Sequence, residues 1–394
     1  MKNKEKWVLC VGSSFSAVPI YFILKKYGFK VAVCGNEKND PCHQYADKSF
    51  FIDYSDKDEL LKLVQEEKFE YIVPTCNDSA YVSSAKVAYI AGYPGFDNPE
   101  NVSILHTKNE FRAFTEKFNI DAPKSVRLNF KFPQDNIGLD YPLIVKPVNV
   151  SGGRGVSKVD NEKDLTSSLE TAASFSDTDT IVIEEFKEGT LHSHSAFVKD
   201  GKLFTDFFVD EFCTVYPWQV NCSNYPSNIS ESTRNLVRKN IEKLVETLEI
   251  VDGLLHTQFI LDKNGEDVWL VECMRRAPGD LYGKLIERAT GFDYFDAYVR
   301  PFIGKELNQP YLKKKEKFYG RHTISVSKPV VYFSFVNNLP AKNLEIVMLK
   351  NSGMMLGVAP FDKLAIVFSE FDEGSSLFQT TPHMDKFITI NTME

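Results

Sequence analysis

The sequence of 394 residues has no long apolar run and no excess of positive charge. No stretch approaches the roughly 18 apolar residues that a membrane-spanning helix needs. The formal net charge is −8, from 46 Lys and Arg against 54 Asp and Glu. Proteins that hold nucleic acid by its phosphates need clustered Lys and Arg, so we expect neither a nucleic-acid partner nor a membrane.

Cysteines are few and follow no pattern. There are seven, an odd number, and no two of them form a CxxC pair. Cys10, Cys34 and Cys76 lie in apolar, strand-like runs, which favours reduced, buried thiols over disulfides or zinc ligands. The opening MKNKEKWVLCVGSSF is charged but has no apolar core of useful length, so we expect no secretory signal and a cytoplasmic protein.

The first hundred residues alternate short apolar runs with helical patterns. Such alternation predicts an open parallel sheet, whose ligands bind outside the carboxyl ends of the strands. The segments Gly12 to Ser14 and Thr75 to Asp78 would then share one rim. The turn GSSFSA at 12–17 lacks the second and third glycines of GxGxxG, which argues against the alternative of a nicotinamide-dependent oxidoreductase.

A glycine-rich turn separates two apolar strands in LIVKPVNVSGGRGVSKV, residues 143–159. Lys146 precedes the glycines and no helix follows them, so this is not the GxxxxGK[ST] phosphate loop. Glycines in such a turn let backbone N–H groups close over phosphates, while Lys146 reaches the same phosphates from its strand. A plain hairpin is the alternative.

Two later segments carry oxygen-bearing side chains. IVIEEFKEG, residues 181–189, ends an apolar strand with acids and an aromatic residue, which could hold adenine and ribose or could simply be solvated. In HTQFILDKNGEDVWLVECM, Gln258 and Glu272 are 14 residues apart, about right for facing positions across a hairpin turned at Asn264-Gly265. Hard oxygen ligands on neighbouring strands suit Mg²⁺ on nucleotide phosphates.

Basic and imidazole side chains flank this hairpin. Arg275 and Arg276 follow it at once and suit phosphate or carboxylate recognition, with a surface salt bridge as the alternative. His192 and His194 alternate in phase on one strand, where they could contact ribose or substrate or be partly buried polar positions. His256 is in phase with Gln258 and could line the cleft.

Taken in order, the lysine in TKNEF, the IVKP…SGGRGV turn, the IEEFKEG strand end and the HTQF…WLVECMRR hairpin resemble the ATP-grasp superfamily of carboxylate–amine ligases. The resemblance covers roughly residues 5–305 and is to the branch of L-amino-acid ligases and biotin carboxylases. It implies an α/β and α+β fold in three parts. These are a Rossmann-like domain at 1–105, a two-lobed ATP-grasp domain at 106–310 (small lid lobe 106–183, large lobe 184–310) and a β-rich C-terminal segment at 311–394.

The resemblance also implies a reaction and a set of residues. The γ-phosphoryl group of ATP would pass to a carboxylate, and an amine would attack the acyl phosphate to give an amide, ADP and phosphate. The cofactors would be ATP and Mg²⁺, which Mn²⁺ could replace, and the partners a small carboxylate and a small amine. The expected ATP-binding residues are Lys108, Lys146, Ser151, Gly152, Gly153, Gly155, Glu184, Glu185, Phe186 and His192. The expected metal ligands are Glu272 and Gln258, and the expected catalytic residues are Arg276, Lys146 and Arg275.

Two positions depart from the family pattern. The family has an acid where Gln258 stands, and Met274 occupies the usual place of an Asn, although a thioether is a poor partner for Mg²⁺. Mg²⁺ could then be held largely by ATP and Glu272, or another acid such as Asp280 could help. The alternative function is ATP binding without ligase activity. The C-terminal segment could close the cleft or form a homodimer surface.

Overall fold

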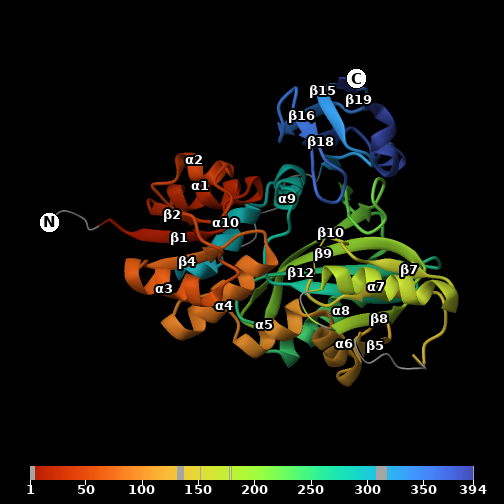
Figure 1. The fold of residues 1–394 in the computed structure, drawn as a ribbon, viewed down its shortest axis with the longest axis horizontal. Coiled ribbons are helices and arrows are strands. Elements are labelled where there is room, and N and C mark those ends of the chain that lie inside the picture. Colours follow the sequence, from red (N-terminus) through yellow and green to blue (C-terminus); the bar gives the residue numbers. More distant parts are fainter. Residues whose placement is uncertain are drawn as a thin grey trace.

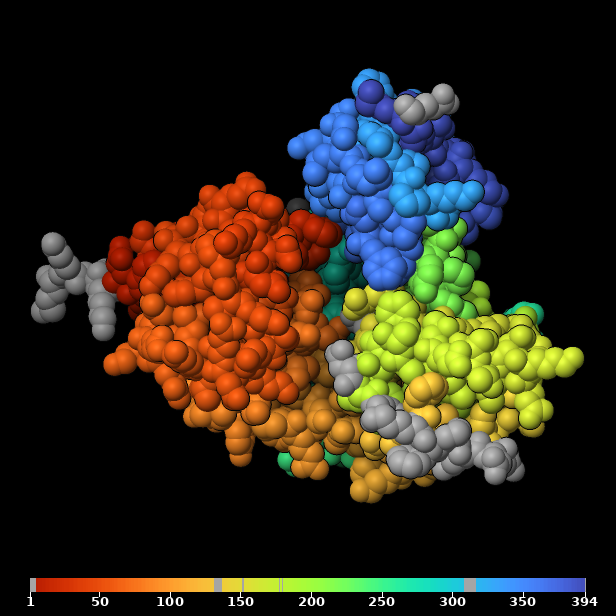
Figure 2. Space-filling model, viewed as in Figure 1, coloured from red at the N-terminus to blue at the C-terminus, as the bar shows by residue number. Residues whose placement is uncertain are grey.

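The computed structural model describes residues 5–130, 137–150, 152–176, 178, 180–307 and 317–393. Within them the chain builds four sheets, and Figure 1 shows the N-terminal sheet on one side and the other three on the other. Figure 2 shows the surface hollowed where the N-terminal body, the lid sheet and the C-terminal strands meet. No helix in the described part of the chain is both long and apolar enough to cross a membrane.

The N-terminal sheet is parallel, as the alternation predicts. Its order is β3 (Lys48–Phe50), β2 (Lys30–Cys34), β1 (Trp7–Val11) and β4 (Tyr71–Pro74). Helices α1 (Val18–Lys26), α2 (Pro41–Tyr45) and α3 (Lys57–Glu67) connect the strands, and α4 (Asp78–Ala91) follows β4. Gly12 ends β1 with φ +111°, and a Cβ there would lie 2.1 Å from Thr75 Oγ1 after β4, so only glycine lets the two strand ends approach. The predicted shared rim is confirmed.

The cysteine prediction also holds in outline. All seven cysteines are free, and Cys10 and Cys34 are fully buried in the N-terminal sheet. Cys76 is half-buried at the rim, so it is less enclosed than predicted.

A small antiparallel sheet carries the glycine turn, and we call it the lid sheet. Its order is β5 (Ser125–Asn129), β8 (Thr180–Glu185), β6 (Leu143–Pro147) and β7 (Ser157–Val159). Helix α7 (Leu165–Phe175) packs on it through a small apolar core that includes Val145 and Ala172. The glycine turn therefore joins two adjacent strands, β6 and β7, as predicted.

An eight-stranded sheet, the large sheet, forms the rest of the core. Its order is β13 (Val268–Met274), β12 (Gly253–Asp262), β9 (Gly189–Lys199), β10 (Lys202–Phe212), β11 (Cys222–Tyr225), β14 (Phe318–Ile324), β18 (Ala365–Phe371) and β16 (Asn343–Met348). Helices α6 (Lys108–Lys117) and α8 (Glu231–Thr247) cover one face. Helices α9 (Tyr282–Thr290) and α10 (Tyr294–Val299) contribute to the core on the other face, which we call the cleft face.

The C-terminal region is rich in strands, which confirms that part of the predicted fold. A three-stranded sheet has the order β17 (Met355–Leu356), β15 (Val330–Asn337) and β19 (Ile388–Met393), with α11 (Gly374–Thr380) and a 3-10 helix (Thr381–Phe387) beside it. The large sheet itself continues beyond residue 311, because β14, β16 and β18 belong to it. The domain boundary at 310/311 stays a prediction.

Candidate functional site

Lys146 lies in a buried cluster of charges. Strand β6 carries it beside β8, and its Nζ lies 2.7 Å from Glu184 Oε1. Arg112 Nε of α6 donates to the same oxygen at 2.8 Å. Burial lowers the pKa of Lys146 to about 8 although Glu184 opposes this shift. Burial would raise the pKa of Glu184, but Arg112 and Lys146 together hold it below its ordinary value.

This cluster adds a residue to the predicted set. The Glu184 carboxylate of the lid sheet lies between the two cations, and its expected contact with adenine or ribose stays a prediction. Arg112 was not predicted, and its two Nη atoms donate to the carbonyls of Leu270 and Val271 at 3.1 and 2.6 Å. It therefore joins the lid sheet to strand β13.

The pKa of Lys146 predicts how nucleotide affinity depends on pH. The ammonium form attracts phosphate, so in the free protein the affinity for an ATP analogue should fall as pH rises through about 8, approaching tenfold per pH unit. Calorimetric titrations between pH 6.5 and 9.5 measure this. Lys146→Arg keeps its charge at these pH values and should flatten the profile. A wild-type affinity that is constant to pH 9.5 would contradict this role of Lys146.

The glycine turn is docked against the loop between β10 and β11. Lys108 Nζ donates to the carbonyl of Val150 at 2.7 Å, so it lies beside the turn as expected. Gly152, Gly153 and Gly155 all have φ near +71°, the left-handed region that favours glycine. Tyr216 donates its hydroxyl to the carbonyl of Gly153 at 3.2 Å. Ser151 lies outside the described residues, and the ATP contacts of this turn stay predictions.

Alanine substitutions at two neighbouring glycines distinguish the effect of a steric clash from the effect of backbone strain. A Cβ at Gly153 would lie 2.2 Å from the carbonyl oxygen of Trp218, whereas one at Gly152 would meet nothing within 4 Å. Both residues have positive φ, so Gly152→Ala carries the same backbone penalty without the clash. We expect Gly153→Ala to weaken ATP-analogue binding at least tenfold more than Gly152→Ala, by titration calorimetry. Equal effects of the two variants would show that the contact with Trp218 is unimportant.

The metal hairpin pairs as predicted. Gln258 on β12 lies directly opposite Glu272 on β13, and the hairpin turns at Asn264-Gly265. The Gln258 amide Nε2 donates to Glu211 Oε2 of β10 at 2.5 Å. Burial raises the pKa of Glu211, and the charge of Glu272 adds to this rise. Three oxygen-bearing side chains thus gather on the cleft face, and sequence reasoning found two of them.

The same face carries a buried cation further across the large sheet. Arg321 on β14 is 3% exposed and donates to the Ser223 hydroxyl at 2.7 Å and to the carbonyl of Asp280 at 3.0 Å. Its Nε is buried with no hydrogen-bond partner in the described part of the chain. A guanidinium with a free donor beside the row of oxygens suits a carboxylate or phosphate group. No short motif marks Arg321, and only the sheet order brings it to the site.

Arg276 is held at the rim of the N-terminal sheet. Its Nε and Nη2 donate to the two oxygens of Asp78 at 2.9 and 2.8 Å. The backbone N–H of Arg275 donates to Nε2 of His106, so His106 carries its proton on Nδ1 and donates it to Asp78. Burial would raise the pKa of Asp78, but Arg276 and His106 hold it well below its usual range. Arg276 therefore stays the candidate for the transferring phosphoryl group.

Arg275 has a different role from the one predicted. Its side chain is 2% exposed, its Nε donates to Asp97 at 2.6 Å, and its Nη atoms donate to the carbonyls of Leu254 and Val251. The guanidinium is thus buried between the large sheet and the loop before α5 (Pro99–His106). The catalytic prediction for Arg275 is corrected to a structural one.

Alanine substitutions of Arg275 and Arg276 should have different effects on stability and on turnover. Arg275→Ala leaves Asp97 buried without its cation, so the free energy of unfolding should fall by about 3–5 kcal/mol. Arg276→Ala removes a partly exposed pair and should cost about 1 kcal/mol or less while abolishing turnover. Denaturant titrations and initial rates measure the two quantities. A stable but inactive Arg275→Ala would restore its catalytic role.

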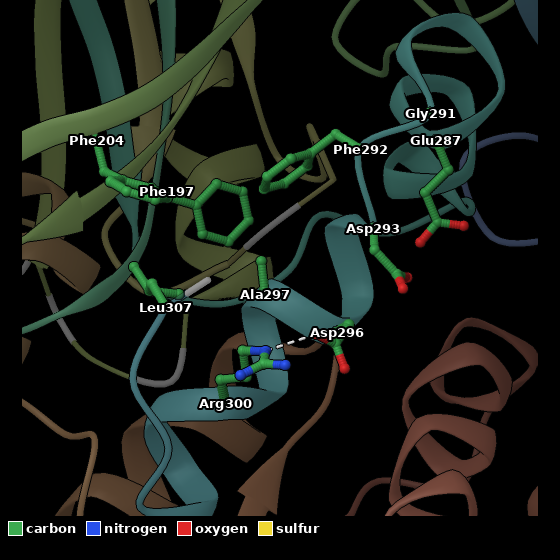
Figure 3. Close-up of a pocket in the computed structure, with 10 residues that line it drawn as sticks. All are labelled: Phe197, Phe204, Glu287, Gly291, Phe292, Asp293, Asp296, Ala297, Arg300 and Leu307. Atoms are coloured by element: carbon green, nitrogen blue, oxygen red, sulfur yellow. Dashed lines mark hydrogen bonds and ion pairs between the residues drawn. The ribbon is translucent and has the colours of Figure 1, made fainter. Parts of the chain in front are cut away.

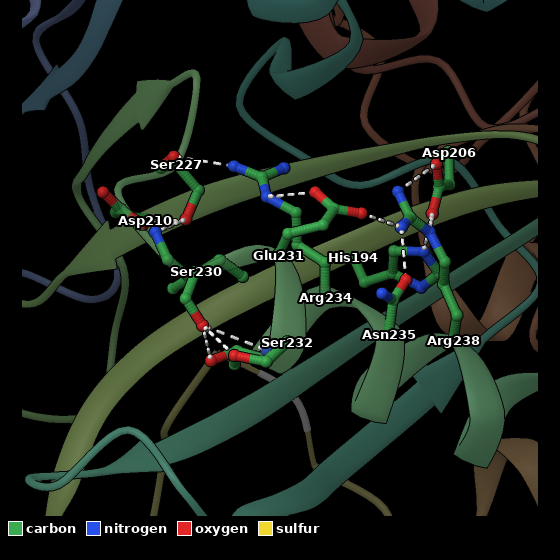
Figure 4. Close-up of polar contacts among 12 residues, drawn as sticks. His194, Asp206, Asp210, Ser227, Ser230, Glu231, Ser232, Arg234, Asn235 and Arg238 are labelled. Atoms are coloured by element: carbon green, nitrogen blue, oxygen red, sulfur yellow. Dashed lines mark hydrogen bonds and ion pairs between the residues drawn. The ribbon is translucent and has the colours of Figure 1, made fainter.

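The histidines divide between the two faces of the large sheet. His192 Nδ1 lies 2.9 Å from Asp210, and its ring stacks on Phe259, which belongs to the core under α6 and α8. Figure 4 shows His194, Asp206 and Arg238 gathered beside α8 on that side. Residues 192 and 194 do share a face, but it is opposite to the face of Gln258, so the prediction that His192 binds the cofactor is corrected.

His256 lies on the same face of β12 as Gln258, as predicted. Its Nδ1 lies 2.7 Å from the Ser195 hydroxyl, and it is 2% exposed. Burial, and then the charge of Arg276, hold the pKa of His256 well below its ordinary value. It is therefore a neutral side chain beneath the cleft face.

Asp280 is engaged elsewhere and does not join the metal row. Its carboxylate accepts from Lys363 and, at 3.0 Å, from the Thr323 hydroxyl. It links the turn before α9 to the C-terminal strands. In the described residues, no group of three or more His, Cys, Asp or Glu is arranged to hold a metal ion, so a cation here would need ligands from Gln258 or from a nucleotide.

The predicted adenine segment includes most of β8 and the residues after it. Glu185 accepts from the backbone N–H of Lys124 at 2.9 Å and pairs with Lys187. The Phe186 ring lies 4.7 Å from Lys158 Nζ of the lid sheet. Both side chains are partly exposed at the end of the strand, and their contact with ATP stays a prediction.

A separate hollow of about 340 Å³ lies at the bend between α9 and α10. Figure 3 shows Phe197, Phe204 and Phe292 on one side of it and Asp293 and Asp296 on the other. It contains none of the predicted site residues.

Residues 139–283 match the family model described as the ATP-grasp domain. This chain contains an ATP-grasp domain. The matched segment includes Lys146, the glycine turn, Glu184, Gln258, Glu272 and Arg276, whereas Arg112 and Arg321 lie outside it. The sequence-based assignment and the fold class are confirmed.

Known structures resemble the whole chain at low identity. The L-amino acid ligase from Bacillus licheniformis has a TM-score of 0.78 at 17% identity, with 100% of both chains covered. Phosphoribosylglycinamide synthetase from Anaerococcus prevotii has a TM-score of 0.76 at 17% identity, covering 99% of this chain and 100% of that one. These likenesses show the fold.

Curated relatives are similar over about three quarters of the chain. The formate-dependent phosphoribosylglycinamide formyltransferase of Prochlorococcus marinus is 24% identical over 76% of each protein. The C-terminal section of the carbamoyl phosphate synthase large chain of Methanopyrus kandleri is 23% identical over 74% of this chain. The match covers 55% of that relative and 27% of the Xanthomonas campestris large chain.

Proposed function

We propose that this protein is an ATP-dependent ligase that activates a carboxylate as an acyl phosphate and joins it to an amine. The observation that carries this proposal is the bridge made by Arg112. It binds Glu184, the partner of Lys146, and also the backbone of β13, the strand of Glu272. The lysine expected at the phosphates and the acid expected at the metal are thus tied together.

The positive charges at the lid sheet and at the large sheet suit a nucleoside triphosphate. Arg112 and Lys146 share one carboxylate, so the cluster keeps a net positive charge toward the cleft. Arg276 and Arg321 add two further guanidinium groups. Positioning and charge neutralisation of this kind carry most of the catalysis in phosphoryl transfer.

The residues present also fit a divalent cation. Glu272, Gln258 and Glu211 offer the hard oxygen atoms that Mg²⁺ prefers. When bound with ATP, Mg²⁺ would neutralise charge on the β- and γ-phosphates. A biotin carboxylase domain of similar fold from Hydrogenobacter thermophilus was crystallised with MgADP and bicarbonate, which supports this choice.

The chain's own groups would then act in sequence. Lys146 orients the phosphates from β6, and the glycine turn excludes water from the acyl phosphate. Arg276 stabilises the transferring phosphoryl group, and Arg321 binds a substrate carboxylate. The attacking amine loses its proton as the amide forms and phosphate leaves.

The alternative of ATP binding without ligase activity was motivated by Gln258 and Met274. Glu211 places a carboxylate beside Gln258, so the lack of an acid at position 258 no longer favours that alternative. We favour an amino acid or small peptide as one substrate, because an L-amino acid ligase is among the similar structures. A cytoplasmic location and a homodimer stay predictions from the sequence.

The decisive assay measures ADP and amide formed from ATP, Mg²⁺ and a panel of amino acids, dipeptides and other small carboxylates and amines. We expect ADP release to require both a carboxylate and an amine. Lys146→Ala should abolish product while leaving the circular dichroism spectrum intact. Unchanged turnover in Lys146→Ala, or ATP binding without turnover on any pair, would contradict the proposal.

A further inference from the structure

Glu211 is a buried acid that the sequence pattern does not account for. It is 5% exposed, and within the described residues no ion pair joins it to Lys, Arg or His. A buried carboxylate with no ion pair is costly, and the hydrogen bonds from Ser193 and Gln258 and the more distant charge of Arg321 compensate that cost only in part. The Gln258 amide donates a hydrogen bond of 2.5 Å to the Glu211 carboxylate.

Strand pairing shows how Glu211 reaches the metal hairpin. Gln258 of β12 lies between Glu272 of β13 and Ser193 of β9. Ser193 pairs in turn with Val209 of β10, and residue 211, two positions further, lies on the same face. Neighbouring strands are about 4.8 Å apart, so the long Glu211 side chain crosses β9 above the small Ser193 to meet Gln258.

The result is a pair of carboxylates on either side of one amide. Glu272 faces Gln258 from the edge strand, and Glu211 faces it from the interior of the sheet. Like charges this close oppose each other, and a divalent cation removes that opposition. Asp280, the other candidate acid, is already held by Lys363 and Thr323.

We propose that Glu211 and Glu272 are the two carboxylate ligands of the divalent cation that accompanies ATP, and that Gln258 is a positioning residue that holds Glu211. The acid that β12 lacks is thus supplied by β10. This inference rests on the proposed function, because ATP brings the cation to the site.

The structure suggests a swap that tests the proposal without changing the shape of the site. Glu211→Gln removes one carboxylate, and Glu211→Gln combined with Gln258→Glu moves it a few ångströms to the other end of the same hydrogen bond. Glu287→Gln is the matched control, because Glu287 is a half-buried acid of α9 that pairs with Lys284, away from the row.

The readout is the dissociation constant of Mn²⁺ from the complex of the protein with β,γ-imido ATP, from the electron paramagnetic resonance signal of free Mn²⁺. Glu211→Gln and Glu272→Gln should each raise this constant roughly tenfold or more, the scale seen when a supporting group of a metal site is lost. The double variant should return to within about threefold of the wild type, and Glu287→Gln should not change it. Thermal melts of the free proteins should show that every variant folds.

Three outcomes overturn the proposal in different ways. If Glu272→Gln weakens Mn²⁺ binding and Glu211→Gln does not, Glu211 is not a ligand, and the proposed ligase function is untouched. A Glu211→Gln variant that instead raises only the KM for the amine would assign Glu211 to the substrate. If the wild type binds no Mn²⁺–nucleotide complex, the proposed function fails and the ligand assignment fails with it.

Discussion

The site depends on the position of one guanidinium. Arg112 is 3% exposed and is bound by the Glu184 carboxylate of the lid sheet and by two carbonyls of strand β13. Removing a charge from water is unfavourable unless hydrogen bonds compensate it, and here three of its donor atoms have partners. Lys146 and Arg112 share a single carboxylate, so the cluster lacks one negative charge. A triphosphate would supply that charge at the junction of the two sheets.

The second constraint is the order of strands in the large sheet. Side chains alternate between its faces, and the cleft face collects Glu272, Gln258, Ser193, Glu211, Ser223 and Arg321 from six strands. Glu272 lies at one end of this row, Glu211 in its middle and Arg321 at the other end. A cation and an anionic group can therefore be held side by side, which is the arrangement that phosphoryl transfer to a carboxylate requires.

Local patterns predicted the elements well, because they depend on residues close together in the chain. The turn at Asn264-Gly265 fixes the hairpin, and so the pairing of Gln258 with Glu272 followed from counting residues. The parallel N-terminal sheet and the strand–glycine–strand lid followed from periodicity. Which face a strand turns toward the cleft did not follow, and His192 was therefore assigned to the wrong side.

Contacts between residues far apart in the chain could not be predicted either, because local patterns do not show which strands become neighbours. Glu211 meets Gln258 across β9, and Arg321 reaches the site only through the order β10, β11, β14. Arg275 and Arg276 are neighbours with identical side chains, and the sequence does not distinguish them. Asp97 holds the first in the interior, and Asp78 holds the second at the rim.

A crystal structure with Mg²⁺ and a non-hydrolysable ATP analogue tests the central claim most directly. The account predicts the triphosphate between the lid sheet and the cleft face, with Lys146 Nζ and the Arg276 guanidinium within about 3 Å of phosphate oxygens. A nucleotide bound on the opposite face of the large sheet, beside His192, would contradict it, as would phosphates that leave Lys146 paired with Glu184 alone.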